Sequence, residues 1–323
     1  MDDPVAILEQ VKGVLDHWSL EPVEIDVASQ SENIVYKVTT LEGNFALRIH
    51  RPGYHTLEEL NAEHEWTGAL SQAGFLLPTT RPATTGEFYI PVKVNGGTRY
   101  AGLIEWLDGS AMKDQEDDEP TDELNLQQLS ALGELIAKLH NHSSAWQHSV
   151  SFTRHHLDVD GFFGPSPFWG RYWESPSINK GQRALLLSTQ NTIAGILKNL
   201  GKERNVFGMI HADLHRGNVF ISHDKMYLID FDDAGFGWYL YDIAVALYEY
   251  NFEEDYQTIE AAFLDGYTKH RVLADAHRAL LPMFLHIRSR AIIGWATARP
   301  ELKQQALIDG LVQQTCKEAV FYG

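Results

Sequence analysis

Two short stretches of the sequence contain residue types that suit phosphoryl transfer. The first follows an apolar lead and contains Asp213 and Asn218, and the second is apolar and ends at Asp230. We expect strands at both apolar stretches and a hairpin between them, which would bring the three side chains into one small volume. One Asp can face an attacking hydroxyl group, while an Asn and a second Asp offer the hard oxygen ligands that Mg²⁺ prefers. The sequence therefore indicates metal-assisted phosphoryl transfer.

The spacing of these residues is more specific than their types. From His211 to Asn218 the chain has the H-x-D-x-x-x-x-N spacing of the kinase catalytic loop, and Asp230-Phe231-Asp232 stands where that template has D-F-G. The alternative is a polar loop whose acidic residues only cap helices. Because an apolar strand that ends in Asp-Phe at hairpin distance makes a chance match rare, we favour the catalytic interpretation.

These motifs resemble the signature of the aminoglycoside phosphotransferase, choline kinase and homoserine kinase superfamily, and the resemblance extends over nearly the whole chain. It implies an α+β protein with the bilobal protein-kinase-like fold. In that fold ATP binds between a small antiparallel-sheet lobe and a larger, mainly helical lobe. The resemblance also implies that Asp213 is the catalytic base and that Asn218 and Asp230 bind Mg²⁺.

Four further residues near the motif would have supporting roles: His211, His215, Asp232 and Asp242. We expect His211 to bond to backbone groups and shape the loop. For His215, a structural role and a contact with a phosphate both stay open. Asp232 would either join the metal site or orient Asp213. By the same resemblance, Asp242 would cap the helix that it begins and brace the catalytic loop.

The N-terminal part of the chain has the pattern of an antiparallel sheet with one inserted helix. About the first 20 residues have a helical stripe of apolar side chains. Two hairpins are predicted, each with a glycine in its turn: 33–39 with 44–49, and 88–94 with 98–106. Between them, 57–73 is predicted to be helical.

Several residues of this part resemble the family's nucleotide site. Ser31 and Asn33 stand in the loop that would cover the phosphates. Arg48 occupies the strand position where kinases place an ATP-pairing Lys, and a guanidinium can also bind phosphates, with a different geometry. Its partner on the helix should be Glu63, with Glu59 as the competitor. The alternative is that Glu63 is an ordinary exposed acid of the helix.

The segment after the second hairpin resembles the hinge between two lobes. Adenine would bond to backbone groups of Glu105 and Leu107, and the alternative is a plain edge strand. We therefore divide the chain into a nucleotide-covering lobe at 1–105, a hinge at 106–109, and a catalytic and acceptor-binding lobe at 110–323.

The second lobe is predicted to be mainly helical. Helical patterns run over 126–139, 193–200, 242–250, 258–267 and 278–298, and a strand pair over 219–222 and 226–230. The stretch 162–173 is dense in Phe, Trp, Gly and Pro and is predicted to be an aromatic loop.

The charge of the chain limits its partners. Lys and Arg number 26 against 44 Asp and Glu, which gives a net charge of −18, and the segment Asp114–Glu123 alone has seven acidic residues. Such a surface repels nucleic-acid backbones and anionic lipids, so we expect neither a nucleic acid polymer nor a membrane as a partner. A nucleotide neutralised by a metal ion still fits this charge. We read the acidic segment as a solvated loop rather than a site that recruits cations.

Cysteine content and hydropathy bear on the compartment. One cysteine, Cys316, allows no internal disulfide, and the 15 histidines show no zinc-binding spacing. The start lacks the apolar run of a secretory signal, and no stretch approaches the length of a membrane span. We expect a cytoplasmic protein. The sequence leaves its oligomeric state open.

The function that these observations favour is transfer of the γ-phosphoryl group of ATP, with Mg²⁺, to a hydroxyl group of a small acceptor. The negative charge favours an amine-bearing acceptor of the aminoglycoside, choline or homoserine type. Aromatic residues such as Phe162, Trp169 and Tyr172 could hold an ammonium group, although packing between helices is their commoner role. The alternatives are a Ser/Thr protein kinase of the same fold and a nucleotide-binding pseudokinase without turnover, which Arg48 keeps open.

Overall fold

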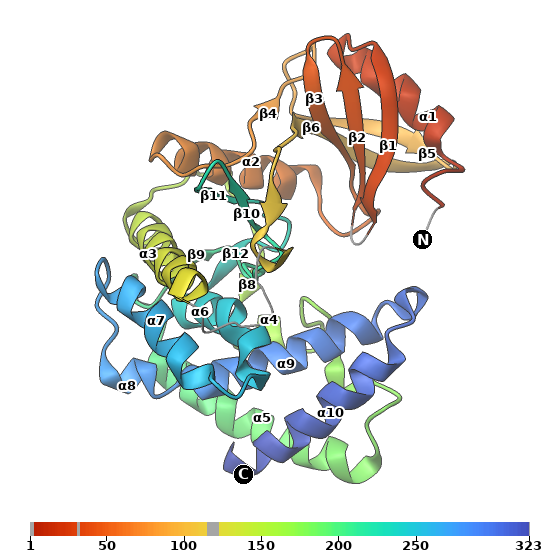
Figure 1. Cartoon of the computed structure of the whole chain (residues 1–323). Helices are drawn as coiled ribbons and strands as arrows, with labels where there is room; N and C mark the ends of the chain where they lie inside the picture. The colour runs from red at the N-terminus through yellow and green to blue at the C-terminus, as the bar shows by residue number, and fades with distance from the viewer. Residues whose placement is uncertain (1–2, 31–32, 115–122, 323) are drawn as a thin grey trace. The chain divides into compact units, whose positions relative to one another are not determined.

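The computed structural model describes residues 3–30, 33–114 and 123–322. Its elements form two compact units (Figure 1): the first comprises Met1–Ser110, His148–Thr153 and Phe220–Ile229, and the second comprises Ala111–Gln147, Arg154–Val219 and Asp230–Gly323. The two short segments at 148–153 and 220–229 thus belong with the first unit, although the sequence places them in the C-terminal lobe. The lobe and hinge boundaries given above stay a prediction. Ser31 and most of the acidic segment lie outside the described residues.

The first unit is built on an antiparallel sheet. Its strands are β1 (Pro22–Gln30), β2 (Ile34–Thr40), β3 (Gly43–Ile49), β4 (Thr80–Arg81), β5 (Tyr89–Val94) and β6 (Gly97–Glu105). They run in the order β1-β2-β3-β6-β4, with β5 paired to β6. The two predicted hairpins, β2 with β3 and β5 with β6, are confirmed.

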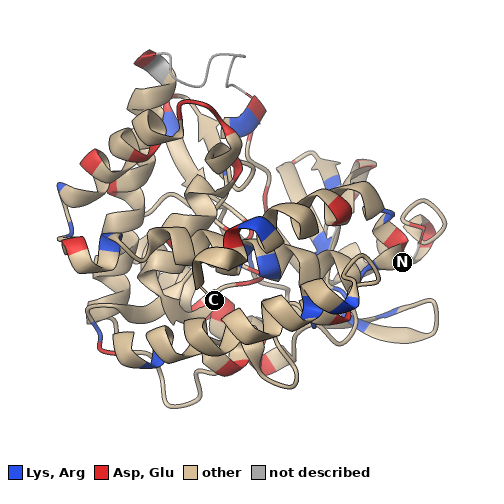
Figure 2. Cartoon of the chain, turned by 90° about the horizontal axis from the view of Figure 1, so that it is seen from below, with Lys and Arg blue, Asp and Glu red and all other residues tan. Residues whose placement is uncertain are grey.

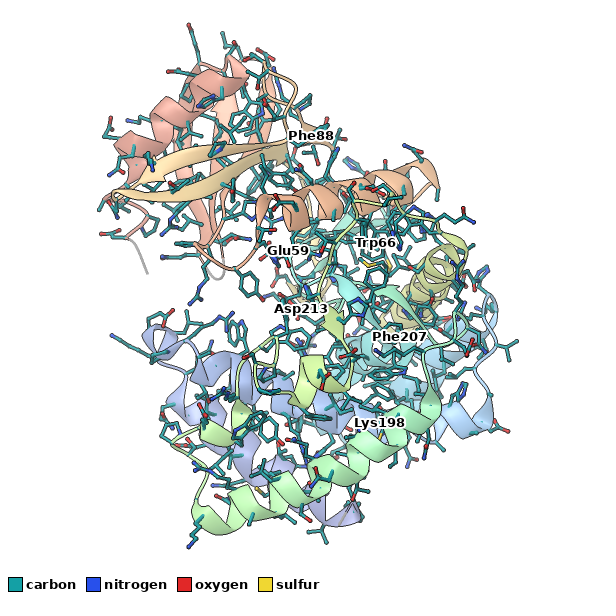
Figure 3. All side chains as sticks on the ribbon, turned by 180° about the vertical axis from the view of Figure 1, so that it is seen from behind. Glu59, Trp66, Phe88, Lys198, Phe207 and Asp213 are labelled. Atoms are coloured by element: carbon teal, nitrogen blue, oxygen red, sulfur yellow. The ribbon has the colours of Figure 1, made fainter. Side chains whose placement is uncertain are left out.

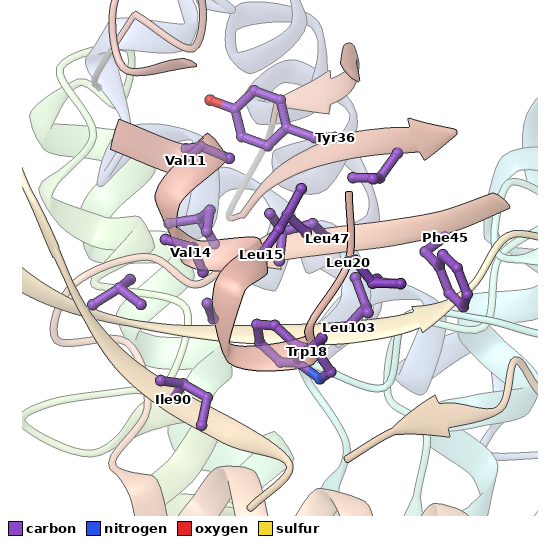
Figure 4. Packing of buried hydrophobic residues seen from close by; sticks show 14 of the residues in the cluster. Val11, Val14, Leu15, Trp18, Leu20, Tyr36, Phe45, Leu47, Ile90 and Leu103 are labelled. Atoms are coloured by element: carbon purple, nitrogen blue, oxygen red, sulfur yellow. The ribbon is translucent and has the colours of Figure 1, made fainter. Parts of the chain in front are cut away.

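One face of this sheet is covered by the N-terminal helical segment. Helix α1 (Leu8–Lys12) and the 3-10 helix η1 (Gly13–Trp18) bury an apolar stripe against the strands (Figure 4). The stripe includes Val11, Leu15 and Trp18, and the indole N–H of Trp18 donates to the Arg81 carbonyl at 2.9 Å. The predicted amphipathic pattern therefore corresponds to a real packing face.

The strand period places Arg48 on the opposite face of the sheet from this core. Leu47 and Ile49 are buried in the α1 core cluster, and successive side chains of a strand point to opposite faces. Arg48 lies in the central strand β3, between Val35 of β2 and Gly102 of β6.

Helix α2 (Leu57–Gln72) supplies the acidic residue that Arg48 meets. The helix begins with a capping box, in which Thr56 accepts from the Glu59 N–H and the Glu59 carboxylate accepts from the Thr56 N–H. Glu59 lies at the beginning of the helix and Trp66 further along it (Figure 3). Glu63 is 5% exposed, on the buried face that also holds Trp66. The interpretation of Glu63 as an exposed helix acid is therefore wrong.

The second unit is mainly helical. Its helices are α3 (Glu123–Ala145), α4 (Val159–Phe163), α5 (Lys180–Leu200), α6 (Tyr239–Tyr248), α7 (Tyr256–Thr268), α8 (Asp275–Arg278), α9 (Leu281–Thr297) and α10 (Gln305–Ala319). A small sheet runs in the order β8 (His156–Leu157), β12 (Gly235–Trp238) and β9 (Phe207–Ile210). With the antiparallel sheet of the first unit, these helices confirm the predicted α+β class.

Helices α3 and α7 approach each other closely because two glycines face the partner backbone. A Cβ atom on Gly133 would collide with the Phe263 carbonyl, and one on Gly266 would collide with the Ser130 carbonyl. This contact fixes α3, whose C-terminal half contains His140.

Some predicted elements differ from the observed ones. The helix predicted at 193–200 starts at Lys180, where Asn179 and Gln182 form a capping box. The helix predicted at 278–298 is interrupted before Leu281, because Pro282 cannot donate a helical hydrogen bond. The predicted aromatic loop includes the end of α4 and the 3-10 helix η3 (Tyr172–Glu174). Strands β8 and β12 and helix α10 were not predicted.

Figure 2 shows acidic and basic residues interspersed along the ribbons in that view. Within the part of the chain that the structure describes, none of the helices has the length and hydropathy that crossing a membrane requires.

Candidate active site

The catalytic-loop motif begins where a strand ends. Strand β9 finishes at Ile210, directly before His211, which confirms the predicted apolar lead. β9 pairs antiparallel with β12, and Ile210 lies opposite Gly235. The loop then reaches Asn218, and the chain continues into the hairpin of β10 (Val219–Ser222) and β11 (Lys225–Leu228). This hairpin confirms the predicted strand pair and returns the chain to Asp230.

A buried carboxylate holds the start of the loop. Asp242 accepts hydrogen bonds from the backbone N–H groups of His211 at 3.0 Å and Ala212 at 2.7 Å. Ala212 has φ +68°, a left-handed conformation that costs free energy for a residue with a Cβ, so the two bonds stabilise a strained turn. Asp242 does not cap its helix. Helix α6 begins at Tyr239, so Asp242 lies within the first turn, and its two carboxylate oxygens accept bonds from the loop instead.

His140 completes this support from α3. Its Nε2 lies 3.2 Å from Asp242 Oδ2 and its Nδ1 lies 2.9 Å from the Tyr267 hydroxyl. Burial lowers the pKa of His140 although Asp242 opposes that effect, and the lowered pKa favours the neutral ring. With Asp242 as the acceptor, Nε2 must be protonated, and Nδ1 then accepts from the Tyr267 hydroxyl. Sequence reasoning missed this contact.

Asp213 is contacted at both carboxylate oxygens. The Asn218 side-chain amide donates to Asp213 Oδ2 at 3.2 Å and to the Asp213 carbonyl at 2.9 Å. Arg288, from the middle of α9, donates through Nη2 to Asp213 Oδ1 at 2.6 Å. Asp213 is labelled in Figure 3. The structure therefore brings Asp213 and Asn218 together and adds an arginine that the motif does not contain.

Arg288 is a contact of Asp213 that sequence reasoning missed. Burial lowers the pKa of its guanidinium, but the Asp213 carboxylate and Tyr241 outweigh burial and raise that pKa overall. The available signal was composition: Arg288 and Arg290 stand in the largely apolar stretch from Leu281 to Ala296. Charged side chains in such a stretch need a buried partner.

The two histidines of the loop make short-range contacts. Nδ1 of the buried His211 lies 3.4 Å from the Asp213 N–H, and Nδ1 of His215 accepts from the Gly217 N–H at 3.0 Å. Nε2 of His215 is 3.6 Å from Asp213 Oδ2. Both rings therefore bond to the backbone of the loop, and His215 also faces Asp213.

The donor set suits a hard divalent cation. Because the Asn218 amide nitrogen is used by Asp213, its Oδ1 is the side-chain atom that could face a metal. Asp230 is exposed at the end of the hairpin, with φ +63°, and Asp232 is buried. Among the described residues, no three or more His, Cys, Asp or Glu side chains are grouped so that they could hold a metal ion. An Asn and an Asp fit Mg²⁺, which retains waters and takes phosphate oxygens as further ligands.

In the first unit, Arg48 Nη1 and Glu63 Oε1 are 3.9 Å apart, with the two side chains 13% and 6% exposed. The competitor Glu59 is used by the capping box. Asn33 is buried, and its Oδ1 accepts from the Arg51 N–H at 3.2 Å, so this oxygen is used within the sheet region. Arg48 therefore has the predicted helix partner, while its contact with a nucleotide stays a prediction.

At the predicted hinge, the Glu105 N–H donates to the Thr79 carbonyl at 2.9 Å. A nucleobase bond at Glu105 would therefore have to use its carbonyl. Leu107 lies beyond the end of β6 and is partly exposed. Close to it, Gly109 is required, because a Cβ there would collide with the Ile221 carbonyl.

The aromatic residues considered for an ammonium group are packed inside the second unit. Phe162, Trp169 and Tyr172 are each at most 5% exposed. The guanidinium of Arg290 lies 5.2 Å from the centroid of the Tyr172 ring and 5.9 Å from that of Phe163. The cation beside these rings is therefore the chain's own Arg290.

The described geometry is that of a kinase-type phosphotransferase. Residues 25–280 match the family model described as "Phosphotransferase enzyme family", and the chain belongs to this family. The resemblance noted from the motifs, and the protein-kinase-like fold it implied, are thereby confirmed.

Known proteins of this kind share much of the chain. A homoserine kinase of Rhodopseudomonas palustris (strain BisA53) is 28% identical over 265 residues, which cover 80% of this chain and 73% of that protein. The structure of a microcompartment-associated aminopropanol kinase superposes with a TM-score of 0.86 at 27% identity, covering 98% of this chain and 97% of that one. An amicoumacin kinase solved with AMP-PNP and Ca²⁺ has a TM-score of 0.80 at 21% identity, covering 98% and 94%.

Membership in the family makes the chain a phosphotransferase enzyme, and the relatives named above are kinases.

Proposed function

We propose that this protein transfers the γ-phosphoryl group of ATP, with Mg²⁺, to the hydroxyl group of a small amino alcohol. The observation that supports this most is the contact between Asn218 and Asp213 at the end of β9. It leaves a carboxylate to face the acceptor and an amide oxygen to face a cation, which are the two functions that phosphoryl transfer needs side by side.

Asp213 orients the acceptor hydroxyl and receives its proton as the bond to phosphorus forms. Asn218 and Asp230 would hold Mg²⁺, which when bound neutralises charge on the phosphates. His211 and Asp242 keep the loop in shape through backbone bonds. Asp232 would either join the metal site or orient Asp213.

For the nucleotide, Arg48 would bond to phosphate oxygens while Glu63 holds its side chain in place. Asn33 would contribute to the phosphate-covering loop, as would Ser31, which lies outside the described residues. The Glu105 carbonyl and the Leu107 backbone would bind adenine.

The acceptor class rests on charge and on the relatives. The net charge of −18 favours a cationic small molecule. Homoserine and aminopropanol, the compounds in the names of the homoserine kinase and the aminopropanol kinase, each contain an amino and a hydroxyl group. An amino alcohol is the chemistry common to both.

The test is Mg²⁺-dependent ATP consumption by the purified protein, alone and with aminopropanol, homoserine, choline, aminoglycosides or a generic protein. The matched control for each amino alcohol is the same alcohol without its amino group. We expect consumption with an amino alcohol, little with the control alcohol, loss on chelation and recovery with Mg²⁺. Phosphorylation of the protein substrate alone would favour a protein kinase. ATP binding without consumption under every condition would favour a pseudokinase.

A further inference from the structure

Two arginines on helix α9 are nearly buried but have different partners. Arg288 donates to Asp213 Oδ1 at 2.6 Å. Arg290 is 1% exposed and donates to the Tyr172 hydroxyl at 2.9 Å and to the Leu186 carbonyl at 3.1 Å. Residues two apart on a helix point to different sides, so the two guanidinium groups serve different parts of the unit.

The partners of Arg290 are those of a structural residue. They are neutral groups of α5, of η3 and of α9 itself, including Thr189 Oγ1 at 2.6 Å and His286 Nε2 at 3.0 Å. Burial lowers the pKa of Arg290, although Tyr172 opposes that effect. The loss of Arg290 would therefore leave several buried acceptors without their donor, and the expected cost is stability.

The partner of Arg288 is the proposed base itself. Arg288 bonds to Oδ1 of Asp213 while Asn218 bonds to Oδ2, so the carboxylate is held from both sides and cannot turn about its Cβ–Cγ bond. A carboxylate fixed before the acceptor arrives needs no reorganisation during the reaction.

We infer that Arg288 is a positioning residue for phosphoryl transfer: it holds the Asp213 carboxylate in the orientation that faces the acceptor hydroxyl. This inference rests on the proposed role of Asp213. The proposed role of Arg288 involves no contact with ATP. It differs from the role of Arg290, which supports only the packing of α9.

The experiment compares Arg288→Met with Arg290→Met in the full chain, measuring kcat, the KM values for ATP and acceptor, and the Tm. For Arg288→Met we expect kcat to fall by about 10²-fold with the KM for ATP changed by less than about threefold. For Arg290→Met we expect a lower Tm with kcat within about threefold of wild type. Arg288→Lys should recover part of kcat, because an ammonium keeps the charge but loses the planar guanidinium.

The conservative variants Arg288→Lys and Arg290→Lys replace the Met variants where those fail to fold. Normal kcat in a folded Arg288 variant, while Asp213→Asn is inactive, would overturn the inference and leave the proposed function intact. An equal fall in kcat for the Arg290 variant would also overturn it, because the effect would then belong to packing. Full turnover in Asp213→Asn would instead remove the assigned base.

Discussion

The two ion pairs of the proposed mechanism, one in each unit, differ in how closely the partners meet. In the first unit, Arg48 and Glu63 are 3.9 Å apart, beyond the length of a hydrogen bond, although both side chains are nearly buried. In the second unit, Arg288 and Asp213 are 2.6 Å apart, and the Asp213 side chain is 26% exposed. The Arg48–Glu63 pair is long and nearly buried, whereas the Arg288–Asp213 pair is short and its carboxylate is partly exposed to solvent.

This difference fits two different tasks. A guanidinium has five N–H donors, so Arg48 can stay beside Glu63 and still bond to a phosphate. Asp213 has the opposite need, because a base that receives a proton from a hydroxyl must keep one orientation. We therefore expect the first pair to govern nucleotide binding and the second to govern turnover.

The largest expected effect comes from breaking the second pair at Asp213. Asp213→Asn removes the proposed proton acceptor, and we expect kcat to fall by about 10³-fold, in the range of general-base contributions. The affinity for ATP should stay within about threefold, measured by titration calorimetry. Full turnover on a confirmed acceptor would contradict the assignment of the base.

Breaking the first pair at Arg48 should act on binding instead. Arg48→Met removes the charge proposed to face the phosphates, and we expect the Kd for ATP to rise by about 10- to 100-fold, the loss of one charge-assisted bond or two. The Tm without nucleotide serves as the control for folding. An unchanged Kd would show that Arg48 does not contact the nucleotide.

Two acids of helix α2 form a matched comparison. Glu63→Gln weakens the hold on Arg48, and we expect kcat/KM for ATP to fall by about 10-fold. Glu59→Gln alters the capping box and the contact of Glu59 with His55, so it should lower the free energy of unfolding by about 1 kcal/mol or less and leave kcat/KM unchanged. Equal kinetic effects of the two variants would mean that Glu63 acts through helix stability.

The smallest effect is expected from Arg48→Lys, which is to be compared with Arg48→Met. The ammonium keeps the charge near Glu63 and the phosphates but loses the planar donor geometry. We expect the Kd for ATP to change by less than about threefold. A loss as large as that of Arg48→Met would show that the planar guanidinium is required.

The fold was predicted best where local patterns decide it. The hairpins of the first unit and the amphipathic stripe around Leu15 followed from periodicity and turn glycines, because these signals act between near neighbours in the sequence. Strand β12 was missed because Gly235–Trp238 is short and glycine-rich, and it is a strand through pairing with β9 and β8. The helix that contains α9 was predicted to begin at 278, although Pro282 marked its start at Leu281.

The candidate site was likewise predicted best where the signal is local in the sequence. The spacing from His211 to Asn218 predicted residues that the structure brings into contact, because the loop is a local motif on the end of a strand. The competitor Glu59 could be set aside only by the structure, which uses it in a cap and buries Glu63. The aromatic rings near Tyr172 look like an ammonium site in sequence, but Arg290 already lies against them.

By itself, the sequence determined the class of chemistry, the α+β fold and the family, because these depend on residue types at fixed local spacing. The tertiary structure decided which distant residues meet: Arg288 on Asp213, His140 on Asp242, and Glu63 on Arg48. The physical reason is that a buried charge must find its partner wherever the packing of helices and strands places one. The spacing of residues along the sequence does not encode which of these distant residues meet.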